Sequence, residues 1–206
     1  MTASQRRFAN PFTLLTVLRD KGMQITQHLG FRGGTVDIMP TATTSLDLPY
    51  RPCVGIMLIN GDGLVWVGRR LPKWQGDRSA YIWQMPQGGI TTGESAEAAA
   101  LRELEEETAV RSVEVLAQAR SWLSYDLPNE LLGIALKGRY RGQKQKWFAM
   151  RFTGQDSEID ISARLGHKAE FDDWRWAQPT ELPQLAVPFK RQIYLDVVRT
   201  FGRFLG

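Results

Sequence analysis

Cysteine and histidine are scarce in this sequence. Among 206 residues there is one cysteine, Cys53, and there are two histidines, His28 and His167. A single cysteine excludes an internal disulfide and is compatible with a reducing cytoplasm, and the apolar neighbours of Cys53 favour a buried structural thiol. His28 lies in an irregular N-terminal segment and His167 in a polar loop, so both are poor candidates for a catalytic base.

Long apolar runs are also missing. The stretch Phe12–Leu18 is too short to span a membrane, and no small-residue cleavage site follows it, which argues against a secretory signal. The hydrophobic fraction of 43% is ordinary for a globular chain, and the net charge of +4 suits an anionic partner. We expect a cytoplasmic protein with no membrane association and no obligate protein partner.

Residues 1–49 differ from the rest of the chain because they lack strong periodicity and end in the polar run 41–45. Three interpretations remain open: a poorly ordered extension, an organellar presequence, or a start site assigned too early, with Met39 as the alternative start. Peptides from before Met39 in the natural protein would exclude that last hypothesis. In each case we expect one catalytic domain over residues 50–206.

Strands and helices alternate along this domain. An amphipathic helix is predicted over 190–204, with Ile193, Val197, Val198 and Phe201 on one side. Strands mixed with two substantial helices favour an α+β or α/β layered fold. The predicted strands cover residues 54–59, 64–69, 81–85, 113–119, 122–125, 146–152 and 170–176.

Acidic residues are concentrated in one predicted helix. The segment 86–110 reads as a Gly-rich loop followed by this helix. At about 100° per residue, Glu103, Glu106 and Glu107 share one face, where a single ion could touch all three carboxylates. The apolar stripe expected beside them consists of Ala100, Leu101 and Leu104.

This acidic face is unfavourable without a counterion. Like charges at i,i+4 cost roughly 0.2–0.5 kcal/mol per pair, acids in the last turn oppose the helix dipole, and Arg102 relieves only part of the repulsion. A hard divalent cation such as Mg²⁺, bound by carboxylates, water and substrate phosphates, would reverse the balance. A solvated acidic helix end is the usual alternative for such a run, and the loop before the helix favours the metal site.

The glycines of that loop leave backbone N–H groups free to approach an anion, and Ser95 or Thr92 can cap the helix. Five residues separate Gly88 from Glu94, and seven more separate Glu94 from Arg102. This spacing resembles the Nudix box, a pattern that is specific because many positions must agree. One position departs from it, since Ala109 stands where the family usually has the glycine that closes the helix.

The wider chain, from about residue 50 to 204, resembles the bacterial branch of the Nudix family that contains RNA pyrophosphohydrolases and dinucleoside polyphosphate hydrolases. The short segments that carry the resemblance occur in the same order as in that branch. They are Tyr50–Pro52, Trp83–Gly89, Gly142–Phe148, Glu170–Trp176 and Val187–Arg191.

The resemblance implies a fold and a metal site. The fold is an α/β/α sandwich with a central mixed sheet and a catalytic loop-helix-loop. The cofactor is Mg²⁺, which Mn²⁺ or another divalent cation could replace. The ligands and catalytic carboxylates it implies are Glu103, Glu106, Glu107 and Glu170, with the loop around Gly88.

The resemblance also implies substrate contacts. Arg51 and Arg70 would hold phosphates or the first nucleotide, and Val187, Phe189 and Lys190 would line a base pocket. A basic stretch over 137–146 contains Lys144 and Lys146. Its cations would offset the repulsion between a phosphate-rich substrate and the acidic helix; a solvated hairpin face is the alternative.

Three functions remain open from sequence. The first is a hydrolase that converts the 5′-triphosphate or 5′-diphosphate end of RNA to a monophosphate, and so initiates RNA decay. The second is a hydrolase of dinucleoside polyphosphates, which needs the same metal cluster. The third is a non-catalytic RNA-binding module that keeps the fold. Glu106, Glu107 and Glu170 are all candidates for the general base.

Overall fold

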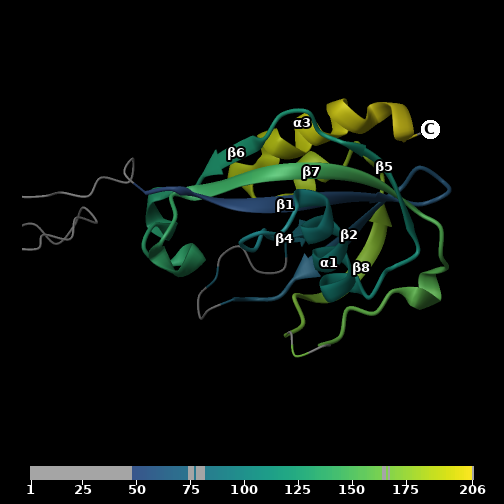
Figure 1. Ribbon diagram of the computed structural model, residues 1–206, viewed down its shortest axis with the longest axis horizontal. Helices are drawn as coiled ribbons and strands as arrows, with labels where there is room; N and C mark the ends of the chain where they lie inside the picture. Colours follow the sequence, from purple (N-terminus) through teal and green to yellow (C-terminus); the bar gives the residue numbers. More distant parts are fainter. Residues whose placement is uncertain (1–47, 74–76, 78–81, 164–165, 167, 206) are drawn as a thin grey trace, which may run out of the picture. The chain divides into compact units, whose positions relative to one another are not determined.

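The computed structural model describes residues 48–73, 77, 82–163, 166 and 168–205 (Figure 1). Pro49–Gly206 form one compact unit. Residues 1–47 and His167 lie outside the described residues, so the extension over 1–49 and the Met39 start stay predictions. Within the described part, no helix is both long enough and apolar enough to cross a membrane.

Among the described residues strands dominate the order of elements, α-helices occur at three places, and short 3₁₀ helices lie between them. The elements are β1 (Tyr50–Ile59), β2 (Val65–Arg70), β3 (Trp83–Gln84), β4 (Gln87–Gly89), α1 (Ala96–Thr108), β5 (Val113–Gln118), β6 (Leu123–Asp126), β7 (Gly142–Phe152), β8 (Phe171–Ala177), α2 (Leu182–Leu185) and α3 (Arg191–Phe201).

Strand β1 is the centre of the sheet. It pairs in parallel with β7 along its whole length, from Tyr50 opposite Gly142 to Ile59 opposite Arg151. On its other edge it pairs antiparallel with β2 and with the short strand β4. The path β3-β2-β1-β7-β5 is completed by β8 on β2 and β6 on β7. The prediction of a mixed central sheet is confirmed.

Both faces of the sheet are covered (Figure 1). Alternate residues of β1 project to opposite faces, so Val54, Ile56 and Leu58 pack with the apolar side of α1. Met57 and Ile59 pack on the other side with α3. These two cores make the predicted α/β/α sandwich, and in the closing helix Ile193, Val197 and Phe201 are buried as expected.

The strands at the centre start earlier than predicted. Strand β1 begins at Tyr50 rather than residue 54, and β7 begins at Gly142 rather than residue 146. Their parallel pairing supplies backbone hydrogen bonds to polar residues, which periodicity alone assigns to loops. The predicted apolar stripe of α1 is also corrected, because Leu101 is 38% exposed while Ala99 is fully buried in its place.

The two ends of α1 are capped in different ways. Ser95 is the N-cap, and its Oγ accepts a hydrogen bond from the Ala98 N–H at 3.1 Å. At the C-terminal end Ala109 adopts the left-handed conformation, with φ 65° and ψ −5°. The closing turn therefore forms without glycine, at a backbone cost of roughly 1–2 kcal/mol for a residue that carries a Cβ.

We predict that Ala109→Gly raises the free energy of unfolding by about 0.5–1 kcal/mol, because relief of the left-handed strain exceeds the greater unfolded-state entropy of glycine. Urea denaturation of the full chain measures this. The matched control is Ala98→Gly in the exposed first turn of the same helix, which should lower stability by about 0.5–1 kcal/mol. Equal losses in the two variants would contradict the strained cap.

Candidate active site

The Gly-rich loop lies directly under the acidic helix. Strand β4 pairs with β1 so that Gly88 lies opposite Val54. A Cβ built on Gly88 would overlap the Glu103 carboxylate. Glycine is needed at this position because the carboxylate occupies the space that any side chain would fill.

Arg102 joins the loop to the acidic face. Its guanidinium donates to Glu94 at 2.7 and 2.9 Å, to Glu103 at 2.9 Å and to Glu106 at 3.2 Å. It also donates to the Gly89 carbonyl at 2.9 Å. The hydrogen bond from Arg102 lowers the pKa of Glu94 to about 2. Arg102 thus offsets more of the repulsion than the sequence indicates.

Glu107 is the buried member of the acidic face. It is 8% exposed, and its Oε2 accepts a hydrogen bond from the Gln87 N–H at 3.1 Å. Burial, followed by the nearby charges of Glu170 and Glu103, raises the pKa of this carboxyl well above its ordinary value. The pKa of Glu103 is also raised, again mainly by burial.

Glu170 reaches this cluster from the residue just before β8. Its carbonyl accepts a hydrogen bond from the Leu71 N–H at 2.8 Å, which ties it to the end of β2. The Lys73 Nζ lies 2.7 Å from the Glu170 Oε2. Sequence reasoning did not select Lys73 as a site residue, because it stands in an aperiodic loop far from Glu170 along the chain.

The carboxylates fit a hard divalent cation in chemistry, but they do not yet form a closed cage. Among the described residues, no three acidic, histidine or cysteine side chains lie close enough to hold a metal ion as they stand. Arg102 donates to Glu103 and Glu106 in this arrangement, and the prediction that one ion touches Glu103, Glu106 and Glu107 together stays a prediction. Their oxygens nevertheless provide the donors that Mg²⁺ and Mn²⁺ prefer.

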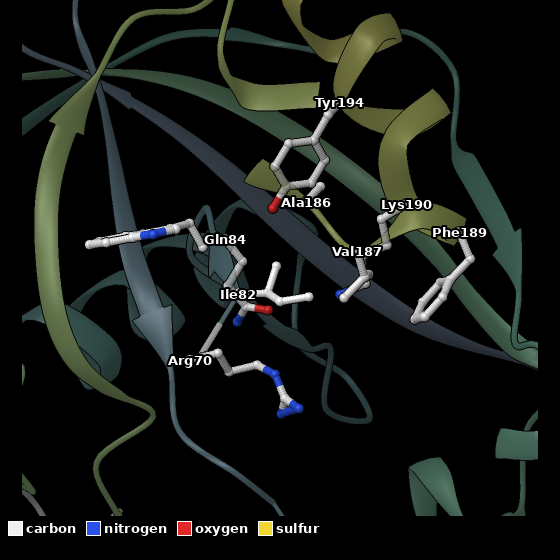
Figure 2. Close-up of a pocket in the computed structure, with 9 residues that line it drawn as sticks. Arg70, Ile82, Gln84, Ala186, Val187, Phe189, Lys190 and Tyr194 are labelled. Atoms are coloured by element: carbon white, nitrogen blue, oxygen red, sulfur yellow. The ribbon is translucent and has the colours of Figure 1, made fainter. Parts of the chain in front are cut away.

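A pocket lies beside β3 (Figure 2). Three parts of the chain line it, namely the end of β2, the region of β3 and the segment 186–194, and they bring together four predicted substrate residues, Arg70, Val187, Phe189 and Lys190. The remaining lining residues are Ile82, Trp83, Gln84, Ala186 and Tyr194.

Lys190 and Arg70 are charged residues of this pocket. Lys190 is 9% exposed, and its Nζ donates to the Gln87 Oε1 at 3.1 Å. Burial, helped by the nearby cations Lys73 and Arg70, lowers the pKa of Lys190 to about 7. Arg70 forms a buried ion pair with Asp77, a partner that the sequence did not indicate.

The other predicted substrate residues are distributed over two faces. The Arg51 guanidinium lies against Gly89, where a Cβ would overlap it. Lys144 and Lys146 are not in the pocket: both ammonium groups lie over the Trp122 ring, at 5.5 and 5.7 Å from its centroid. The structure thus brings Arg70, Val187, Phe189 and Lys190 together and places the two lysines of β7 elsewhere.

The fold and the site together define a class of protein. It is an α/β/α enzyme in which a Gly-rich loop packs against an acidic helix. The NUDIX domain family model matches residues 49–197. The chain therefore belongs to the Nudix family of hydrolases, which in general depend on a divalent metal.

The matches between this chain and its curated relatives cover nearly the whole length of those relatives. An RNA pyrophosphohydrolase of Afipia carboxidovorans is 58% identical over 160 residues, which cover 78% of this chain and 96% of the relative. One of Rhodopseudomonas palustris is 59% identical, over 76% of this chain and 94% of the relative. One of Brucella abortus is 53% identical, over 86% and 97%.

Solved structures agree on the fold. The Ap4A hydrolase of C. elegans in a binary complex has a TM-score of 0.53 at 16% identity, and the match covers 75% of this chain and 97% of that one. The E. coli dihydroneopterin triphosphate pyrophosphohydrolase has a TM-score of 0.50 at 18% identity, over 73% and 98%.

We predict that Gly88→Ala lowers the free energy of unfolding by roughly 1–3 kcal/mol, because the new methyl group displaces the Glu103 carboxylate. Glu103→Ala in the same chain should recover most of the loss, which a double-mutant cycle by urea denaturation measures. Gly61→Ala is the control, since nothing lies within 4 Å of a Cβ there. Additive effects of the Gly88 and Glu103 substitutions would show that the two groups are not in contact.

We also predict that burial of Lys190 makes stability depend on pH. Between pH 7 and 9 the unfolded chain keeps the Lys190 proton, whereas the folded chain has partly released it at a pKa of about 7. Stability contributed by this group therefore rises with pH in that window. Chemical denaturation should show a smaller rise for Lys190→Met than for wild type, and an unchanged rise for the exposed control Lys168→Met. Identical pH slopes for all three proteins would refute it.

Proposed function

We propose that the chain is a metal-dependent RNA 5′-pyrophosphohydrolase that converts 5′-triphosphate or 5′-diphosphate ends to 5′-monophosphates and so initiates RNA decay in the cytoplasm. The observation that carries this proposal is the identity of 53–59% to RNA pyrophosphohydrolases over more than nine tenths of their length. The carboxylates on α1 and the pocket beside β3 supply groups that this reaction needs.

Mg²⁺ is the proposed cofactor, with Mn²⁺ or another divalent cation able to replace it. When bound, such an ion neutralises phosphate charge and lowers the pKa of a coordinated water. Arg102 and Lys73 offset the repulsion between these acids, and Gly88 leaves room for the Glu103 carboxylate. Glu106, Glu107 and Glu170 remain the candidates for the general base. The proposed ligands are Glu103, Glu106, Glu107 and Glu170, with the loop around Gly88.

The pocket of Figure 2 is proposed to hold the first nucleotides of the substrate. Arg51 and Arg70 offer planar guanidinium groups that suit phosphate oxygens, and Phe189 offers an aromatic face for a base. Lys190 would carry its full charge once an anion lies beside it, because a nearby negative charge raises the pKa of an ammonium group.

Parallel rate measurements on triphosphorylated RNA and on diadenosine tetraphosphate test the proposal. We expect faster turnover of the RNA, and loss of roughly 10²–10⁴-fold in turnover for Glu106→Gln, which removes a proposed ligand and candidate base. Glu105→Gln is the matched control, because Glu105 lies on the same helix but binds Arg111 at the surface.

Negligible RNA turnover beside brisk cleavage of the dinucleotide would replace the proposed substrate with a dinucleoside polyphosphate. If wild type and Glu106→Gln were equally inactive with Mg²⁺ while RNA still bound, the chain would be a binding module.

A further inference from the structure

Trp122 is a large aromatic residue exposed on the surface. It lies in the turn between β5 and β6, and it is 39% exposed. The proposed reaction at the carboxylates and the pocket makes no use of it. Exposing an indole ring to water is unfavourable, so the residues around Trp122 indicate which kind of ligand binds over it.

Two lysines of β7 flank this ring. The Nζ of Lys144 lies 5.5 Å from the ring centroid and that of Lys146 lies 5.7 Å from it. Lys146 is held in place by donating to the Arg120 carbonyl at 2.9 Å. We call Trp122, Lys144 and Lys146 the Trp122 surface. It combines one aromatic face with two cations, the combination that binds single-stranded nucleic acid.

The register of the sheet places this surface beside the acidic helix. Val54 of β1 pairs with Gly88 on one side and with Lys146 on the other. Paired residues in neighbouring strands project to the same face, and the Cβ direction of Gly88 meets the Glu103 carboxylate. Lys146 is thus two strand spacings, about 10 Å, from Gly88 on the α1 face of the sheet.

Lys144 and Trp122 lie next to Lys146. Lys144 pairs with Pro52 on β1 and with Ser124 on β6, and it stands two residues before Lys146 on β7. Strands β6 and β7 run side by side there (Figure 1). A chain whose phosphorylated end lies at Gly88 would reach the Trp122 surface about two to four nucleotides further on, given a charge every 3.4 Å or more along one strand.

We propose that the Trp122 surface binds the RNA downstream of its phosphorylated 5′ end, with a base stacked on Trp122 and phosphates at Lys144 and Lys146. This inference rests on the proposed function and names the part of the substrate that this face recognises. Net positive charge around a single ring suits RNA better than an apolar protein partner, which needs a wider apolar patch. Stacking on an aromatic ring tolerates any base, so this contact selects for length rather than sequence.

The test compares two substrates with the same first nucleotides, a triphosphorylated dinucleotide and a longer single-stranded RNA. For wild type we expect a higher kcat/KM on the longer RNA. Trp122→Ala should reduce the ratio of the two kcat/KM values by about tenfold, and Trp122→Phe should keep most of it. For the longer RNA, the slope of log(kcat/KM) against log salt concentration should be shallower by about 0.7 in Lys144→Gln.

The controls separate this surface from general effects of charge and exposure. Arg199→Gln removes a positive charge from the exposed face of α3, where the side chain is 73% exposed, and Ile134→Ala removes an exposed apolar side chain. Both should leave the ratio unchanged. An unchanged ratio in Trp122→Ala and an unchanged salt dependence in Lys144→Gln, in an enzyme that releases pyrophosphate from RNA, would overturn this inference alone. A wild-type enzyme inactive on both RNAs would instead reject the proposed function.

Discussion

The site depends on how the repulsion between neighbouring carboxylates is contained. Arg102 donates to Glu94, Glu103 and Glu106 and to a carbonyl of the Gly-rich loop. One guanidinium therefore fixes the loop against the helix while it neutralises the helix face. The guanidinium carries several N–H donors in one plane, so it can contact all these groups at once, whereas the single ammonium group of a lysine could not. The buried Glu107, with its raised pKa, is the acid that Arg102 does not reach.

Strand β4 couples the two halves of the site although it has only three residues. Gly88 faces α1 and leaves room for Glu103, whereas the side chain of Gln87 projects to the other face and accepts a hydrogen bond from Lys190. Gln87 also donates its backbone N–H to Glu107. A small shift of this strand would thus move the carboxylates and the pocket together. The antiparallel pairing of β4 with β1 holds it in place.

Local pattern predicted the parts of the site that lie close in sequence. The spacing of Glu103, Glu106 and Glu107 placed them on one helix, Gly88 was found under them, and the sandwich and closing helix are confirmed. The ligand roles themselves stay predictions. Lys73 and Asp77 were missed because their partners depend on tertiary packing. Leu101 was misplaced because the sheet-facing stripe of α1 is centred one residue earlier than periodicity indicated.

The central claim is that a divalent cation binds the carboxylates of Glu103, Glu106, Glu107 and Glu170 during the reaction and so offsets their mutual repulsion. Release of pyrophosphate from triphosphorylated RNA, followed before chelation, after chelation and across a Mg²⁺ titration, tests it most directly. The account predicts that chelation abolishes turnover and that added Mg²⁺ restores it with saturation. Turnover that is unchanged after complete removal of divalent ions would contradict it.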